Sequence, residues 1–365
     1  MTSCATGAQG KPLLGILGFL ARGNSGDEAI LQCIYESFFP RFDIVLVIDE
    51  TEARQGYWNW YPYSECQRVH IGDIHFFETR LAGLLVGGGG LGLGYGAAQV
   101  LVAKGAGTPV VLAGVDHPHE EHASLAFAAA THTYLKLFDF IAMRSAKAVS
   151  YAALAGISVF HGADWALKLV ADESSDVKRN TKRVLIVLRE FSEQVVNAEY
   201  YRAQISILFE SLRTSGREPA FMAFCPEDER FLERMELAEI APTVTHWWNP
   251  RRQKQEILNC GLLISVGRLH PMIYAAACAV PNIQIQPPLT ESHSGHSFGK
   301  MLDMAKELGV PYFTNIASAL ESLSEKPPKT FASRDLVQDA TNRLSDMIRR
   351  IDEILLKPGA DLGGQ

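Results

Sequence analysis

The chain has 365 residues, of which 47% are hydrophobic and 21% are charged, with a formal net charge of −7. This composition is typical of a globular protein, and the length suggests about two domains. The negative net charge excludes an overall positive charge that would attract nucleic acid or an anionic membrane. No apolar run reaches the ~18 residues of a membrane span. The polar start MTSCATGAQGKP lacks the pattern of a signal peptide. Six scattered cysteines without a Cys-x-x-Cys pair favour free thiols in a reducing cytoplasm.

The first half of the chain alternates apolar, β-rich runs with helical patterns. We expect strands at Leu13–Phe19, Asp43–Val47, Gly83–Val86, Pro109–Leu112, Phe138–Met143 and Gly156–Phe160. Helical patterns lie between most of them, at Asp27–Phe39, Gly96–Lys104, Glu120–Leu137 and Lys147–Ala155. This alternation predicts a parallel sheet covered by helices.

A charged stretch from Asp172 to Arg183 is the best candidate for a linker, and the α/β pattern restarts after it. The second set of expected elements comprises Val184–Arg189, Asn197–Ser215, Pro219–Phe224, Glu227–Met235, Gly261–Val266, a helix to Cys278, and Asn282–Gln286. A long amphipathic helix, Leu336–Leu356, ends the pattern. We predict two Rossmann-like domains, residues 1–175 and 176–325, and a C-terminal helix within 326–365 that packs back on the first. Such an arrangement places a ligand at the carboxyl ends of the strands.

The stretch GNSGDEAIL, Gly23–Leu31, reads as a tight loop that enters a helix. Asp27 and Glu28 fall in the first helical turn, where negative charge complements the helix dipole. The loop either only turns the chain or also contacts a ligand.

A glycine run follows the third expected strand, and seven of the ten residues from Gly87 to Gly96 are glycine. Its Gly-x-Gly-x-x-Gly pattern is typical of dinucleotide sites, but there it follows the first strand. An NAD-dependent oxidoreductase is therefore the least favoured function. So many glycines favour backbone contact with a polar ligand over close packing alone, and Gly88, Gly89 and Gly90 are the candidate contacts.

Two expected strands deliver an arginine to their carboxyl ends. ISVGRLH places Arg268 and His270 directly before an apolar helix, and IAMR places Arg144 at the end of another strand. Arginine can hold a phosphate or carboxylate with two hydrogen bonds, and histidine can exchange a proton near neutral pH. One arginine from each half would clamp a small dianion, whereas the alternative for each is a structural ion pair.

Together these segments resemble the polysaccharide pyruvyl transferase family. The matching features, in the family's order, are GNSGDEAIL, a strand followed by GGGGLG, IAMR, GAD at Gly162–Asp164, ISVGRLH before an alanine-rich helix that ends in AVP, and Lys300. The resemblance implies two Rossmann-like domains in a GT-B-type arrangement with a cleft between them. The first domain would lie on the acceptor side and the second on the phosphoenolpyruvate side.

The resemblance also implies transfer of the enolpyruvyl group of phosphoenolpyruvate to a sugar, usually as a ketal across two hydroxyls, with no metal or organic cofactor. Arg144, Arg268, Leu269 and Lys300 would then contact phosphoenolpyruvate, and His270 would protonate its methylene carbon. Asp27 and Asp164 are alternative bases for the sugar hydroxyl, and Asn24 and Gly26 would shape the acceptor side. The acceptor would be a sugar or a lipid-linked glycan, so peripheral contact with a membrane stays open, as does a homo-oligomer.

Ser145 and Pro271 depart from the family's pattern, which commonly has an acid and a small helix former at these places. They support one alternative, a non-catalytic relative that binds a sugar or an anion. A second alternative is a GT-B-type glycosyltransferase that uses a nucleotide sugar.

Three further segments carry weaker signals. VDHPHEEHA gathers three histidines and two glutamates, but a strand end followed by an acidic helix start is the better interpretation than a metal site. PPLTESHSGHSFGK is a polar loop that either reaches the ligand or lies on the surface. The aromatic loop YWNWYPY, Tyr57–Tyr63, either stacks on sugar rings, mediates subunit contact or is buried.

Overall fold

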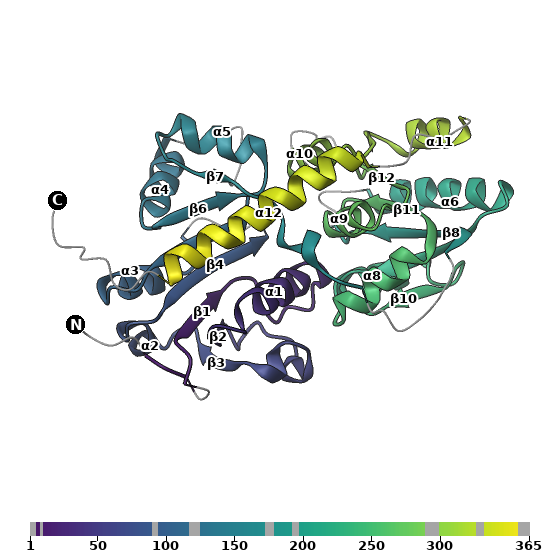
Figure 1. The fold of residues 1–365 in the computed structure, drawn as a ribbon. Helices are drawn as coiled ribbons and strands as arrows, with labels where there is room; N and C mark the ends of the chain where they lie inside the picture. The colour runs from purple at the N-terminus through teal and green to yellow at the C-terminus, as the bar shows by residue number, and fades with distance from the viewer. Residues whose placement is uncertain are drawn as a thin grey trace. The chain divides into compact units, whose positions relative to one another are not determined.

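The computed structural model describes residues 5–7, 10–89, 94–116, 125–171, 179–191, 197–288, 299–325 and 332–356. The chain divides into two compact units (Figure 1). Unit 1 consists of Met1–Arg22, Ile30–Trp165 and Thr341–Gln365, and unit 2 of Gly23–Ala29 and Ala166–Ala340. The loop and first helical turn of GNSGDEAIL therefore belong to unit 2, whereas the rest of that helix belongs to unit 1.

Unit 1 is built on a parallel sheet of seven strands in the order β3-β2-β1-β4-β5-β6-β7. The strands are β1 (Leu13–Leu17), β2 (Asp43–Ile48), β3 (Gln67–His70), β4 (Gly83–Gly89), β5 (Val110–Val115), β6 (Phe140–Met143) and β7 (Phe160–His161). The connecting helices are α1 (Ser25–Phe38), α2 (Ile74–Glu78), α3 (Ala97–Gly105), α4 (Leu125–Leu135) and α5 (Ala146–Leu154). Strands β2, β4 and β5 are buried along their whole length, as expected where helices cover both faces of a parallel sheet.

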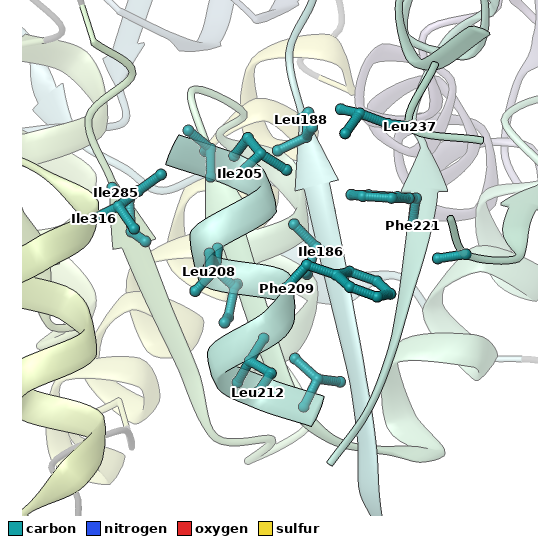
Figure 2. Close-up of a cluster of buried hydrophobic side chains, with 14 of the residues drawn as sticks. Ile186, Leu188, Ile205, Leu208, Phe209, Leu212, Phe221, Leu237, Ile285 and Ile316 are labelled. Atoms are coloured by element: carbon teal, nitrogen blue, oxygen red, sulfur yellow. The ribbon is translucent and has the colours of Figure 1, made fainter. Parts of the chain in front are cut away.

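Unit 2 repeats the plan with six parallel strands in the order β10-β9-β8-β11-β12-β13. They are β8 (Asn180–Leu188), β9 (Glu218–Ala223), β10 (Thr243–Thr245), β11 (Cys260–Val266), β12 (Asn282–Ile285) and β13 (Tyr312–Phe313). The helices are α6 (Ala198–Thr214), α7 (Pro226–Arg234), α8 (Pro250–Leu258), α9 (His270–Ala277), α10 (Gly299–Leu308) and α11 (Ile316–Ser324). Figure 2 shows α6 lying on the sheet through a cluster of buried side chains that includes Ile186, Leu188, Ile205, Leu208, Phe209, Leu212 and Phe221.

The C-terminal helix α12 (Arg334–Leu355) contributes its residues from Thr341 onward to unit 1. Arg343 donates a hydrogen bond to the Gly162 carbonyl at 3.1 Å, and the Arg350 guanidinium lies over the Phe160 ring. A Cβ on Gly83 would overlap the Leu355 side chain. The helix therefore packs against both β4 and the end of β7.

Several elements differ from the sequence expectations. The charged segment around Asn180–Arg183 is not wholly a linker, because β8 already starts at Asn180 with three exposed residues. The strand expected at Gly156–Phe160 is only Phe160–His161. Strand β3 was missed because QRVH is mostly exposed. None of the helices that the structure describes is long and apolar enough to cross a membrane.

Candidate functional site

Charged side chains gather at the carboxyl edge of the sheet in unit 2. Arg189 follows β8, Cys225 lies just beyond β9 and begins the turn into α7, and Arg268 lies two residues beyond β11. These strands are neighbours and parallel, so their carboxyl ends meet at one edge, where α/β proteins build ligand sites.

Arg268 is held by a buried carboxylate. Its Nε donates to Asp228 Oδ2 at 2.9 Å and its Nη2 donates to Asp228 Oδ1 at 2.5 Å. Nη2 also lies 2.8 Å from Cys225 Sγ. Burial opposes the charge of Arg268, but Asp228 outweighs it, so the pKa of the guanidinium is raised. Among the described residues no atom accepts a hydrogen bond from Nη1, so its N–H groups could donate to a ligand.

Asp228 connects three strand-end segments. Its side chain is fully buried, and besides Arg268 it accepts the backbone N–H of Glu190 at 3.0 Å and of Phe224 at 3.2 Å. Each oxygen therefore receives one guanidinium and one backbone hydrogen bond. This arrangement orients Arg268 before any ligand arrives, so binding costs little side-chain entropy.

Arg189 was not among the residues predicted for the site. Its guanidinium lies 5.3 Å from the centre of the Phe191 ring, and no described residue forms a hydrogen bond or an ion pair with it. Burial, and then the neighbouring charge of Arg268, lower the pKa of Arg189. A guanidinium held near a second one without a carboxylate of its own is a strong attractant for an anion. The sequence feature that could have identified Arg189 is its position as the one charged residue at the end of the apolar run VLIVLR.

The turn that presents Arg268 needs a glycine. Gly267 has φ +79°, and a Cβ there would lie 2.8 Å from Phe191 Cζ. Ser265 Oγ donates to the Arg268 carbonyl at 2.7 Å, which secures the turn from the other side. The chain thus reverses direction directly after β11, with Arg268 at the sheet edge.

The start of α1 belongs to the same edge. Ser25 donates its N–H to the Phe224 carbonyl at 2.8 Å, and the Tyr274 hydroxyl donates to the Ser25 carbonyl at 2.8 Å. The next residue, Gly26, lies so close to His270 that a Cβ would overlap the imidazole ring. The opening loop therefore turns the chain and also packs against the predicted catalytic histidine.

The loop supports its own conformation. Asn24 Oδ1 accepts the Gly26 N–H at 3.2 Å, and Glu28 Oε1 accepts the Gly23 N–H at 3.0 Å. Both interactions satisfy groups at a helix N-terminus. Asn24 thus has a structural role in the loop.

His270 is the first residue of α9 and is half-buried, and Leu269 before it is buried. The negative charge of Asp27 contributes to raising the pKa of Arg268. Asp27, Arg268 and His270, together with the N-termini of α1 and α9, therefore lie within one part of unit 2. The arrangement combines two guanidinium groups with a histidine and a carboxylate, the groups needed for anion binding and proton transfer.

Arg144 and Asp164, which the sequence predicted as site residues, pair with each other in unit 1. Arg144 Nε donates to Asp116 Oδ2 and its Nη1 donates to Asp164 Oδ2, both at 2.6 Å. The Arg144 side chain is 1% exposed, and despite the cost of burial the two carboxylates raise its pKa. The ion pair that was the alternative for Arg144 is therefore present, with Asp116 and Asp164 as its partners, and the clamp stays a prediction.

The described part of the glycine run has packing reasons for glycine. Gly87 and Gly88 lie in β4. A Cβ added at Gly87 would lie 2.8 Å from the carbonyl oxygen of Ala113, and a Cβ added at Gly88 would lie 2.5 Å from Ile30 Cγ2. Gly88 and Gly89 both have positive φ. Close packing therefore accounts for Gly88, while contact of Gly88 and Gly89 with a ligand stays a prediction and Gly90 lies outside the described residues.

The remaining predicted positions are less informative. Lys300 is an exposed residue of the first turn of α10. The histidines of VDHPHEEHA and of PPLTESHSGHSFGK lie outside the described residues. Within the described ranges no group of three or more His, Cys, Asp or Glu side chains could hold a metal ion.

Solved structures with a similar fold cover almost the whole chain. Anabaena HepE in complex with UDP and glucose has a TM-score of 0.57 at 13% identity, covering 94% of this chain and 99% of its own. UDP-N-acetylglucosamine 2-epimerase from Rickettsia bellii has a TM-score of 0.58 at 12% identity, covering 95% and 96%. At such identities the likeness shows the fold alone, and it confirms two Rossmann-like α/β units of the GT-B class.

A comparison with curated protein sequences found no match. The family profile described as polysaccharide pyruvyl transferase matches residues 24–285. This match begins in the loop before α1 and ends at the last residue of β12, so it includes every residue of the site in unit 2. The chain belongs to the polysaccharide pyruvyl transferase family.

Proposed function

We propose that this transferase moves the enolpyruvyl group of phosphoenolpyruvate to two hydroxyls of a sugar in a glycan or glycan precursor, forming a ketal and releasing phosphate. The observation that supports it best is the neighbouring pair Arg189 and Arg268, with His270 two residues after Arg268. Among the described residues Asp228 is ion-paired to Arg268, and no carboxylate is ion-paired to Arg189. Phosphoenolpyruvate carries a phosphate and a carboxylate, so it matches two guanidinium groups.

In the proposed reaction His270 donates a proton to the methylene carbon, which becomes a methyl group and leaves C2 electrophilic. One sugar hydroxyl adds to C2, the C2–O bond to phosphate breaks, and the second hydroxyl adds to complete the ketal. Of the two hydroxyl protons, one restores His270 and the other leaves with phosphate. Arg189 and Arg268 stabilise the negative charge that moves onto the departing phosphate.

Asp27 is our choice for the base that assists the attacking hydroxyl. It is half-buried in the same unit as His270 and Arg268, whereas Asp164 is buried against Arg144. A carboxylate committed to a buried ion pair is a poor base, because taking up a proton would break that pair.

The first experiment is a calorimetric titration of the full chain with phosphoenolpyruvate, beside UDP and NAD. We expect saturable binding of phosphoenolpyruvate that Arg189→Ala and Arg268→Ala each weaken by about 1.5–3 kcal/mol, the value of a charged hydrogen bond. Arg213→Ala, on the exposed face of α6, is the matched control and should bind normally. Binding of UDP without phosphoenolpyruvate would favour a nucleotide-sugar glycosyltransferase instead.

His270→Ala separates binding from chemistry. The variant should bind phosphoenolpyruvate nearly as well as the wild type but release no phosphate with an acceptor sugar that the wild type uses. Phosphate release at the wild-type rate would remove His270 as the proton donor. Binding without release in the wild type, across a broad panel of glycosides, would favour a non-catalytic relative.

A further inference from the structure

We propose that unit 1 has a second carbohydrate site, a cavity at the amino-terminal edge of its sheet that holds one sugar ring of the glycan acceptor. The sugar identity of the ligand rests on the proposed function. The cavity has a volume of about 250 Å³, and we call it the amino-edge cavity; its lining residues are Tyr35, Phe39, Phe42, Asp43, Ile44, Ser64, Glu65, Cys66 and Gln67.

The cavity lies at the edge opposite the one expected to carry the chemistry in an α/β sheet. Asp43 and Ile44 begin β2, and Gln67 begins β3. Strands β2 and β3 are parallel and paired, and α1 precedes β2 in the chain (Figure 1). Nothing in the predicted reaction uses this edge, so the cavity needs a separate explanation.

One wall of the cavity is aromatic. The rings of Tyr35 and Phe39 are stacked, with centroids 5.0 Å apart and planes 8° from parallel. Phe39 is 42% exposed, which is costly for a large apolar side chain unless something covers it. Phe42 and Ile44 are buried beneath. A flat ring with an open face is the surface on which the C–H face of a pyranose packs.

The aromatic loop Tyr57–Tyr63 does not line the cavity but contacts this wall through Tyr61. Tyr57 and Tyr63 are buried, whereas Tyr61 is 42% exposed and meets Tyr35 edge-on at 5.7 Å. The Tyr61 hydroxyl donates to Glu36 Oε1 at 3.3 Å. Burial therefore explains part of the loop, while its exposed part extends the aromatic surface beside the cavity.

The opposite wall is polar and carries mixed hydrogen-bonding groups. Glu65 offers a carboxylate, Ser64 a hydroxyl that donates to Glu65 Oε1 at 3.2 Å, and Gln67 an amide. Asp43 is the other carboxylate of the lining. The lining has no cationic side chain, so it is unsuited to phosphoenolpyruvate. A sugar uses both donors and acceptors, whereas a simple cation has no use for the Ser64 hydroxyl or the Gln67 N–H groups.

The size fits one ring. A cavity of about 250 Å³ is smaller than the roughly 300–1,000 Å³ of sites for drug-sized ligands. Exposed Phe39 and Tyr61 would support neighbouring sugars of a longer chain. The site would thus hold an acceptor glycan by a residue other than the one that reacts.

Saturation-transfer NMR tests the inference, with methyl β-glucoside, methyl β-galactoside and methyl N-acetyl-β-glucosaminide as the probes. We expect transfer from the protein to the C–H groups of at least one glycoside. Phe39→Ala and Glu65→Gln should each weaken its binding roughly three- to tenfold, the factor for one aromatic contact or one hydrogen bond. Tyr200→Ala removes an aromatic ring of α6 that is even more exposed than Phe39 and should have no effect.

Several results would overturn the site. They are the absence of transfer from all three glycosides, binding that Phe39→Ala leaves unchanged, or displacement of the bound glycoside by tetramethylammonium, which would indicate a cation site. Arg268→Ala separates the two proposals, because it should weaken phosphoenolpyruvate binding as stated above and leave glycoside binding intact. Wild-type protein that binds a glycoside in the cavity but no phosphoenolpyruvate would contradict only the proposed reaction.

Discussion

In unit 1 one arginine pairs with two carboxylates, whereas in unit 2 Arg268 pairs with one and the neighbouring Arg189 pairs with none among the described residues. Arg144 is enclosed by Asp116 and Asp164 and is 1% exposed. The Arg268 side chain is 16% exposed and pairs only with Asp228. Both clusters lie at carboxyl edges of parallel sheets, so position in the fold does not distinguish the roles that we propose for them, a structural one for Arg144 and a ligand-binding one for Arg268. The clusters differ instead in the number of carboxylates for each arginine and in the guanidinium N–H groups that have no acceptor among the described residues.

Arg144→Ala should have the largest effect on stability. It leaves two buried carboxylates without their cation, and breaking a buried pair costs about 3–5 kcal/mol. Urea unfolding should show this loss, while calorimetry at a temperature where the variant is folded should find normal affinity for phosphoenolpyruvate. An affinity loss as large as that of Arg268→Ala would erase the contrast between the clusters.

Asp228→Asn and Asp116→Asn form a matched pair of buried substitutions. If charge alone mattered, Asp228→Asn would bind phosphoenolpyruvate more tightly, because the site becomes more positive. We expect about tenfold weaker binding, since Arg268 loses the carboxylate that orients it. Asp116→Asn should lower stability but leave the titration unchanged. Tighter binding by Asp228→Asn would show that Asp228 does not position Arg268.

Gly88→Ala and Gly267→Ala compare two glycines of positive φ, one in each unit. Each variant should lose about 1–3 kcal/mol of unfolding free energy from backbone strain and crowding. Only Gly267→Ala should also weaken phosphoenolpyruvate binding, because the added methyl displaces Phe191 beside Arg189. Equal affinities in the two variants would argue that the turn after β11 does not shape the site.

The smallest expected effect is a difference in how the two units respond to pH. Burial, followed by the charge of Arg252, lowers the pKa of His246 in unit 2 below 6.5. As the pH falls, His246 therefore becomes protonated in the unfolded chain before it does in the folded protein. The stability that His246 contributes is full above pH 6.5 and is lost as the pH falls through its folded pKa. Urea unfolding between pH 7 and 5 should show a slight decline that His246→Asn removes.

Asp49 in unit 1 responds at lower pH. A hydrogen bond from the Thr51 side chain lowers its pKa below 3.8. Its contribution is present above pH 3.8 and disappears as the pH falls through the folded pKa. Thr51→Ala should reduce this loss of unfolding free energy, as measured by urea unfolding below pH 4. An unchanged pH dependence would contradict the role of the Thr51 hydrogen bond.

The sequence predicted the fold class because the central strands are short, continuous apolar runs. Val184–Leu188 and Leu262–Val266 can only be buried, and helical patterns follow them. Several of the elements that were missed are polar or very short. Strand β3 is the exposed QRVH and β13 has two residues, while α8 reads PRRQKQEIL. Such segments become regular through their neighbours, a contribution that a local pattern does not contain.

The site was predictable as a set of strand ends but not as a set of partners. Arg268 and His270 were found because they interrupt an apolar pattern. Arg144 interrupts one equally well, yet its carboxylates stand 28 residues before and 20 residues after it. No spacing rule reveals such pairing, and for the same reason the unpaired state of Arg189 could not be read from VLIVLR. Proximity of charges in α/β folds depends on sheet order.

The route of the chain through the two units has a consequence for synthesis. Unit 1 contains Thr341–Gln365, and the helix there supplies Met347 and Leu355 against Gly162 and Gly83. A growing chain therefore emerges from the ribosome with the sheet of unit 1 complete but the surface around Gly83 and Gly162 uncovered. The rest of unit 2 must be made before the helix that covers this surface exists. Apolar surface stays open to water and to chaperones for the whole of that interval.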